Sequence, residues 1–132
     1  MKLSIGFLFF SVAISTSLIS QDRDNISLLA NWDGTDVPFN GSAKYNDVWG
    51  FEIDGQEFGC MGSTLGTHIF SLPENNHIEE VAYVPGRFQG PVVHRDFAFF
   101  WGYPYAVYDQ VTSSPQVINV SNLPYPFSVL LD

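Results

Sequence analysis

The sequence predicts an all-β fold in which one structural unit is written twice. Two stretches of the 132-residue chain repeat at an offset of 47 to 49 residues, so that Gly55 aligns with Gly102 and Phe58 with Tyr105. A period of about 40–50 residues built of short strands and turns is typical of β-propeller blades. The chain also has 11 glycines and 8 prolines and no convincing 3.6-residue apolar period, so long helices are not expected. We therefore expect a partial β-propeller of about two four-stranded antiparallel blades.

The first unit spans residues 46–94 and is expected to contain four strands. A strong hairpin turn, Asp54-Gly55, separates the first two, and Pro85-Gly86 ends the fourth. The apolar runs between the turn residues place the strands at 48–53, 56–61, 67–72 and 78–84.

The second unit spans residues 95–132 and is incomplete. Its turn, Trp101-Gly102, stands where Asp54-Gly55 stands in the first unit, and its strands are expected at 97–100, 103–108, 116–120 and 127–131. Pro104 conflicts with a central strand because proline has no amide hydrogen to donate, so we expect it at a strand edge or a bulge. Four strands per unit is the number in a propeller blade.

The residues before the first unit predict a signal peptide and a leading segment. Lys2 precedes an apolar run that ends in small residues, so residues 1–20 are expected to be a secretory signal peptide. A retained membrane anchor is the alternative, but the run is shorter than the roughly 20 residues that a spanning helix needs. Residues 21–45 are loop-like with one expected strand, at 26–32. We therefore expect a secreted or cell-surface protein that does not insert into the membrane after cleavage.

Composition excludes several classes of function. The net charge is −9 with only five lysines and arginines, so a nucleic-acid partner is not expected. The single cysteine, Cys60, lies in an alternating apolar stretch and is expected to be a buried small hydrophobe. The three histidines lack metal-ligand spacing, so neither a metal nor another cofactor is expected. Aromatic residues make up 16% of the chain, and most of those in 97–105 are expected to fill the space between blades.

Several motifs resemble the choice-of-anchor B family, whose members carry LVIVD-type repeats and occur mainly as exported bacterial proteins. They are Tyr45-Asn46-Asp47-Val48-Trp49-Gly50, Gly62-Ser63, Gly66-Thr67-His68-Ile69-Phe70, His94-Arg95-Asp96, Tyr105-Ala106-Val107 and the stretch 116–123. The chain departs from the family at Ser71 and Asn119, where members carry aspartate. The resemblance implies that further blades are missing from this chain, which would then be an incomplete gene product, a degenerate paralogue or an oligomerising piece. The first is favoured.

The candidate ligand-binding residues are His94, Arg95, Asp96 and Asp47. His94 is a possible base and Asp96 a possible orienting carboxylate, but a repeated aspartate at the start of a unit more often binds loop amides or pairs with arginine. No catalytic constellation stands out. The sequence therefore favours a non-catalytic extracellular scaffold or binding module for an unknown protein or carbohydrate ligand. The alternative is a hydrolase or lyase on the axial face of the propeller, lined by the loops 63–67 and 110–114 with His94 and Asp96 nearby.

Overall fold

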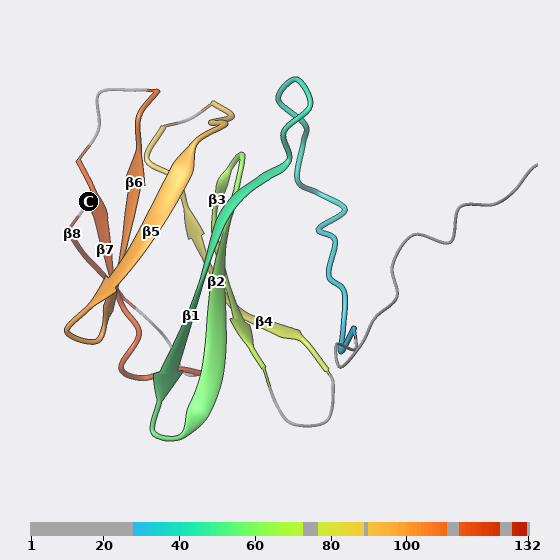
Figure 1. Cartoon of the computed structure of the whole chain (residues 1–132). Coiled ribbons are helices and arrows are strands. Elements are labelled where there is room, and N and C mark those ends of the chain that lie inside the picture. The colour runs from blue at the N-terminus through green and yellow to red at the C-terminus, as the bar shows by residue number, and fades with distance from the viewer. Residues whose placement is uncertain (1–27, 73–76, 89, 111–113, 125–127, 132) are drawn as a thin grey trace, which may run out of the picture.

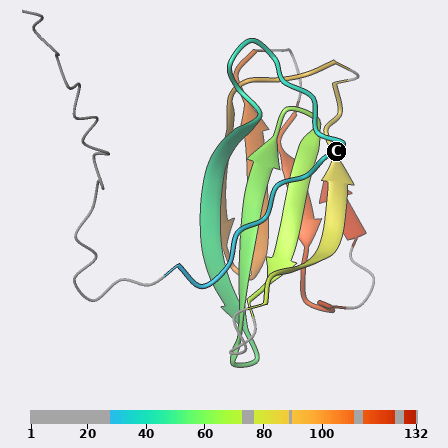
Figure 2. The same ribbon diagram turned by 90° about the vertical axis from the view of Figure 1, so that its right-hand side faces the viewer.

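The structure consists of two antiparallel four-stranded sheets packed against each other (Figures 1 and 2). The computed structural model describes residues 28–72, 77–88, 90–110, 114–124 and 128–131. No helix occurs among these residues. The all-β fold class predicted from the sequence is therefore confirmed, as is the number of strands in each unit.

The first sheet is a meander in the order β1-β2-β3-β4. Its strands are β1 Tyr45–Ile53, β2 Gln56–Ser63, β3 Gly66–Ser71 and β4 Glu79–Pro85. The second sheet repeats this order as β5-β6-β7-β8. Its strands are β5 Arg95–Phe100, β6 Tyr103–Tyr108, β7 Gln116–Asn119 and β8 Ser128–Leu131. Each expected strand of the two units is present, with ends that differ by a few residues; β1, for example, starts at Tyr45 instead of 48.

The first hairpin of each sheet has the same turn geometry. Asp54 and Gly55 have φ angles of 51° and 81°, and Trp101 and Gly102 have 52° and 81°. Two consecutive residues with positive φ between paired strands are characteristic of a type I′ turn, whose twist matches that of the strands. The repeat seen in the sequence is therefore also a repeat of the backbone, and Gly55 and Gly102 occupy equivalent positions.

The two sheets nevertheless bury opposite faces of the repeated hairpin. Phe51 and Phe58 point into the core from the first sheet, but the residues equivalent to them, Ala98 and Tyr105, are not part of the core. In the hairpin of the second sheet the core residues are instead Phe97 and Ala106, next to Ala98 and Tyr105. Because side chains alternate along a strand, a shift by one residue changes the face. The units therefore stack in the same sense and are not related by a two-fold axis.

The core lies between the sheets, which contact each other chiefly where β1 meets β5. The Phe51 ring stacks on Phe99 with 4.9 Å between centroids and on Phe58 with 5.7 Å. Figure 1 shows β1 and β5 running in the same direction, with both hairpin turns at the lower end. The buried apolar residues from the two sheets and the segment after β7 are Phe51, Phe58, Cys60, Ile69, Ala82, Val84, Phe97, Ala106, Ile118, Val120 and Leu123.

Three expectations are corrected by the structure. No strand forms over the described part of 26–32, which is residues 28–32; residues 26 and 27 lie outside the described residues. Pro104 is buried in β6, an inner strand, so it is not at a sheet edge. It is tolerated because the β6–β7 ladder pairs only Tyr105 and Ala106, so the missing donor lies beyond the end of that ladder. Finally, Phe100 and Trp101 are exposed and do not fill the space between the sheets.

Residues 28–37 cross the outer face of the first sheet, the face turned away from the second sheet (Figure 2). Trp32 anchors this segment. Its ring lies 5.0 Å from the His68 ring and 4.9 Å from Phe70, both on β3, and 5.8 Å from Tyr45 on β1. This cover keeps Phe70 and His68 buried although they face away from the core.

Candidate functional site

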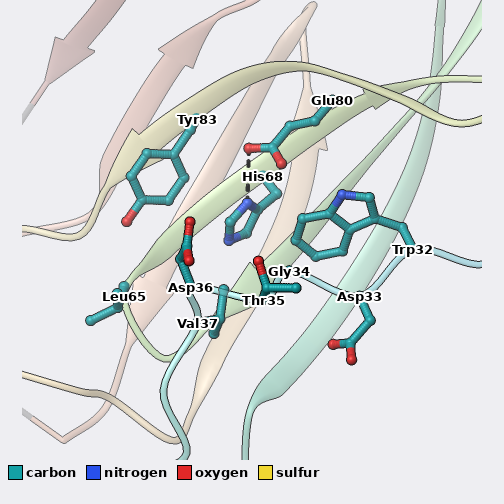
Figure 3. A pocket seen from close by; sticks show the side chains of 10 residues that line it. All are labelled: Trp32, Asp33, Gly34, Thr35, Asp36, Val37, Leu65, His68, Glu80 and Tyr83. Carbon is teal, nitrogen blue, oxygen red and sulfur yellow. Dashed lines mark hydrogen bonds and ion pairs between the residues drawn. The ribbon is translucent and has the colours of Figure 1, made fainter.

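A cavity of about 490 Å³ opens where the leading segment crosses β3 and β4 (Figure 3). Its volume lies within the range of small-molecule sites. The residues that line it come from the segment, the β2–β3 turn and the two strands: Trp32, Asp33, Gly34, Thr35, Asp36, Val37, Leu65, His68, Glu80 and Tyr83.

Hydrogen bonds hold the segment that forms one wall. The Gly34 amide donates to the Tyr45 hydroxyl at 2.8 Å, and the Val37 amide donates to the Gly34 carbonyl at 3.2 Å, which closes a turn. The Asp33 carboxylate accepts hydrogen bonds from the Lys44 ammonium and the Tyr45 hydroxyl. The hydrogen bond from Lys44 is the main reason that the pKa of Asp33 is lowered. The wall is thus in place before any ligand arrives, which lowers the entropic cost of binding.

His68 forms the floor of the cavity and is held on both ring nitrogens. Nδ1 lies 3.1 Å from Glu80 Oε1, and Nε2 lies 2.9 Å from Ser63 Oγ. The imidazole also lies between two aromatic rings, 5.0 Å from Trp32 and 4.9 Å from Tyr83. Only 5% of His68 is exposed. The ring is therefore fixed in place with both nitrogens already engaged.

The chain Ser63–His68–Glu80 has the order of polar groups found in serine hydrolases. A nucleophile must, however, be within reach of its substrate. Ser63 is fully buried and is not among the residues that line the cavity. Its Oγ instead accepts the amides of Leu65 at 3.3 Å and Gly66 at 3.2 Å, so it stabilises the β2–β3 turn. We interpret the chain as a structural network that fixes His68.

The lining of the cavity is acidic and aromatic. Carboxylates are contributed by Asp33, Asp36 and Glu80, and among the described residues no lysine or arginine lines it. Asp33 is neutralised by Lys44 at 2.5 Å, and Figure 3 shows its carboxylate pointing away from the others. Asp36 and Glu80 therefore dominate the charge that a ligand would meet.

A second, smaller cavity lies on the other side of Trp32. Its volume is about 230 Å³, and its walls are mostly apolar. It is lined by Ala30, Asn31, Trp32, Val48, Gly59, Cys60, Met61, Phe70, Leu72 and Ile78. Cys60 also belongs to the core between the sheets, where burial raises the pKa of its thiol to about 12. The expectation that Cys60 is a buried apolar residue is confirmed.

Two of the four residues predicted to bind a ligand connect the sheets instead. Asp47 Oδ2 accepts the Phe97 amide at 2.9 Å, which joins β1 to β5. Arg95 is 1% exposed; its Nη1 donates to the Ser63 carbonyl at 3.1 Å, and its guanidinium lies 5.0 Å from the Tyr108 ring. Burial lowers the pKa of Arg95. The expected structural role of the aspartate, binding a backbone amide, is what Asp47 performs.

The other two predicted residues, His94 and Asp96, are exposed. The His94 amide donates to Gln110 Oε1 at 3.2 Å, and Asp96 lies opposite Val107 in the β5–β6 ladder. Neither residue lines either of the two cavities described above, and neither do Asp47 and Arg95. The structure thus does not bring the four together in a cavity.

The pairing of His68 with Glu80 was not predicted from the sequence. His68 and Glu80 fall in two neighbouring strands that the sequence predicts at 67–72 and 78–84. The two meet because β3 and β4 are antiparallel and because their register shifts between Ile69 and Phe70. The usable signal was the placement of polar residues on neighbouring strands, but the shift in register is not visible in the sequence.

Comparisons with known proteins leave the function open. No protein-family model, no curated protein and no solved structure matches this chain. The resemblance to the choice-of-anchor B family therefore stays a prediction. Within the described ranges, no three histidine, cysteine or acidic residues lie close enough to hold a metal ion. A helix long and apolar enough to cross a membrane is likewise not found in that part of the chain. The predicted signal peptide, 1–20, lies outside the described residues.

Proposed function

We propose that this chain is an exported, non-catalytic scaffold or binding module, in which the two sheets are consecutive blades of an LVIVD-type β-propeller. The observation that carries this proposal is that the two sheets bury opposite faces of the repeated hairpin. Phe51 lies in the core of the first sheet, whereas in the second sheet the core residue is Phe97, the neighbour of the residue equivalent to Phe51. Its ligand, a protein or a carbohydrate, is held in the cavity above β3 and β4.

Stacking in one sense is what a propeller requires. In a head-to-tail row of blades, each blade presents one face to the blade before it and the opposite face to the blade after it. In this chain, residues 28–37 cover the face of the first sheet that would meet a preceding blade. A two-fold pair of sheets would instead bury the same face of both copies. The closest approach of the sheets, at the first strands β1 and β5, also fits blades whose first strands lie nearest the axis.

The outer face of the second sheet has the character of a surface that packs against a further blade. Phe100 on β5 is 59% exposed and Val107 on β6 is 41% exposed. Their equivalents in the first sheet, Ile53 and Cys60, contact or belong to the core. The same positions are therefore apolar in both units, but in the second unit the face lacks a sheet to cover it within the described structure.

Light scattering of the full chain tests the stacking. We expect the exposed face to drive concentration-dependent association, and Phe100→Glu to suppress it because a charge on that face would have to be desolvated. Phe88→Glu is the matched control, since Phe88 is 47% exposed on the connection between the sheets. A monodisperse monomer that behaves the same with and without Phe100→Glu would contradict consecutive stacking.

The alternative function, a hydrolase or lyase, is favoured by one observation, the Ser63–His68–Glu80 chain. Assaying the full chain against ester and glycoside substrates, with His68→Ala and His94→Ala compared, tests it. Activity that disappears in the His68 variant but persists in the His94 variant, with both variants folded, would establish an enzyme. The burial of Ser63 leads us to expect no such activity.

A further inference from the structure

We infer that the cavity lined by Trp32, Asp36, His68, Glu80 and Tyr83 binds an organic cation, a primary ammonium or a guanidinium group such as a lysine or arginine side chain carries. This inference rests on the proposed binding function and names the chemical class of its ligand. It follows from three features of the cavity: the sign of its charge, its aromatic walls and its rigid construction.

The first feature is an excess of negative charge at the cavity. Asp36 is exposed, and Figure 3 shows its carboxylate on the same side of the cavity as His68 and Tyr83. Glu80 accepts from His68 through Oε1, and its side chain remains 31% exposed. Lys44 compensates Asp33 but does not line the cavity. A cation is therefore attracted, and an anionic ligand would meet two carboxylates without a basic partner.

The second feature is a row of aromatic rings beside these carboxylates. Trp32 and Tyr83 lie on either side of the His68 imidazole, each about 5 Å from it between centroids (5.0 and 4.9 Å). Tyr83 is 38% exposed and Trp32 is partly exposed, so both rings are accessible to a ligand. A cation over the face of tryptophan or tyrosine is attracted by the negative face of the ring. Neutral sugars also stack on such rings, but they gain nothing from the charge.

The third feature is that the walls are already in position. The indole is fixed by its contacts with Tyr45, His68 and Phe70, and the Asp36 region follows the turn closed by Gly34 and Val37. With about 490 Å³, the cavity accommodates an extended alkyl chain with a charged head. A metal ion is a poorer fit, because no group of three metal-binding side chains lies together among the described residues.

Titration calorimetry on the full chain tests the inference. The probes are Nα-acetyl-lysine methylamide and Nα-acetyl-arginine methylamide, with the Nε-acetylated lysine compound as the uncharged control. Free butylamine is compared with them to distinguish a peptide side chain from a free amine as the source of the cation. We expect saturable binding of the charged probes and none of the acetylated one.

Two variants locate the binding. Asp36→Asn should weaken binding of the charged probes about fivefold, which corresponds to the loss of one exposed charge pair. Asp96→Asn removes the same charge on β5, outside the cavity, and should leave binding unchanged. Tyr83→Leu should weaken binding two- to fivefold.

The inference would be overturned by equal binding of the acetylated probe, by equal effects of Asp36→Asn and Asp96→Asn, or by no saturable binding of any cation. Saturable binding of an uncharged oligosaccharide in place of the cations would also overturn it, yet would leave the proposed binding module standing. Failure of the module itself is seen separately, in the light-scattering comparison of Phe100→Glu and Phe88→Glu.

Discussion

Replacing Asp47 by alanine should remove one of the polar connections between the two sheets. Asp47 Oδ2 accepts the Phe97 amide at 2.9 Å, from β1 to β5. A hydrogen bond to a charged group contributes about 1.5–3 kcal/mol. In Asp47→Ala the Phe97 amide also loses its acceptor in a partly buried place, so we expect the free energy of unfolding to fall by about 2 kcal/mol.

Urea denaturation followed by tryptophan fluorescence measures this loss. With a urea dependence of about 2 kcal/mol/M, a loss of about 2 kcal/mol moves the midpoint down by about 1 M. Asp47→Asn keeps an oxygen that accepts the amide but removes the charge, so it should cost only about half as much.

Asp96 provides the matched control, because it occupies the same motif position in the second unit but is exposed on β5. Asp96→Ala should change the free energy of unfolding by less than about 0.5 kcal/mol. Equal midpoints for the Asp47 and Asp96 variants would refute the reasoning that the carboxylate of Asp47 joins the sheets.

Three further predictions concern packing and the thiol. Gly66→Ala should destabilise the protein by about 1–3 kcal/mol, because a Cβ would stand 2.4 Å from the Val84 carbonyl oxygen. Gly50→Ala is the control, since its Cβ would have no atom nearer than 4.0 Å; equal thermal midpoints for the two variants would contradict the prediction. Because the pKa of Cys60 is about 12 in the folded protein, its thiol should resist iodoacetamide at pH 8 and react only after unfolding in urea; rapid alkylation of the folded protein would argue against this burial. In the unfolded chain the thiol has its ordinary pKa of 9.0 and ionises earlier, so the free energy of unfolding should decline as the pH rises above 9. Phe58→Ala should cost about 3–5 kcal/mol in calorimetric or urea unfolding, because Phe58 is 1% exposed at the centre of the core; a loss below about 1 kcal/mol would show that the site collapses or is not packed.

The strands and their turns were predictable because they depend on neighbours in the sequence. Asp54-Gly55 and Trp101-Gly102 are short signals for a tight turn, and both form the same turn with positive φ. Alternation of apolar residues located the strands on either side. The strand expected in the leading segment did not form: Trp32 packs on the surface of a sheet without pairing with it, and Leu28 and Leu29 are exposed.

The candidate site was harder to predict because it joins distant residues. The motif match between Asn46-Asp47 and Arg95-Asp96 suggested equivalent aspartates. In the structure, Asp47 lies in the irregular part of β1 between Tyr45 and Val48, whereas Asp96 is a regular member of β5. The two aspartates therefore share a sequence motif but do not occupy equivalent places in the two sheets. The pairing of His68 with Glu80 likewise depends on a register shift in the β3–β4 ladder.

By itself, the sequence determined that this is an all-β chain of two repeated four-stranded units, because turn propensity and apolar alternation act over a few residues. Only the tertiary structure decided which face of each unit is buried and that Trp32 closes a cavity over β3 and β4. These choices depend on the register and stacking of whole sheets. A shift by a single residue reverses the face that a strand presents, and the sequence of one strand does not record it.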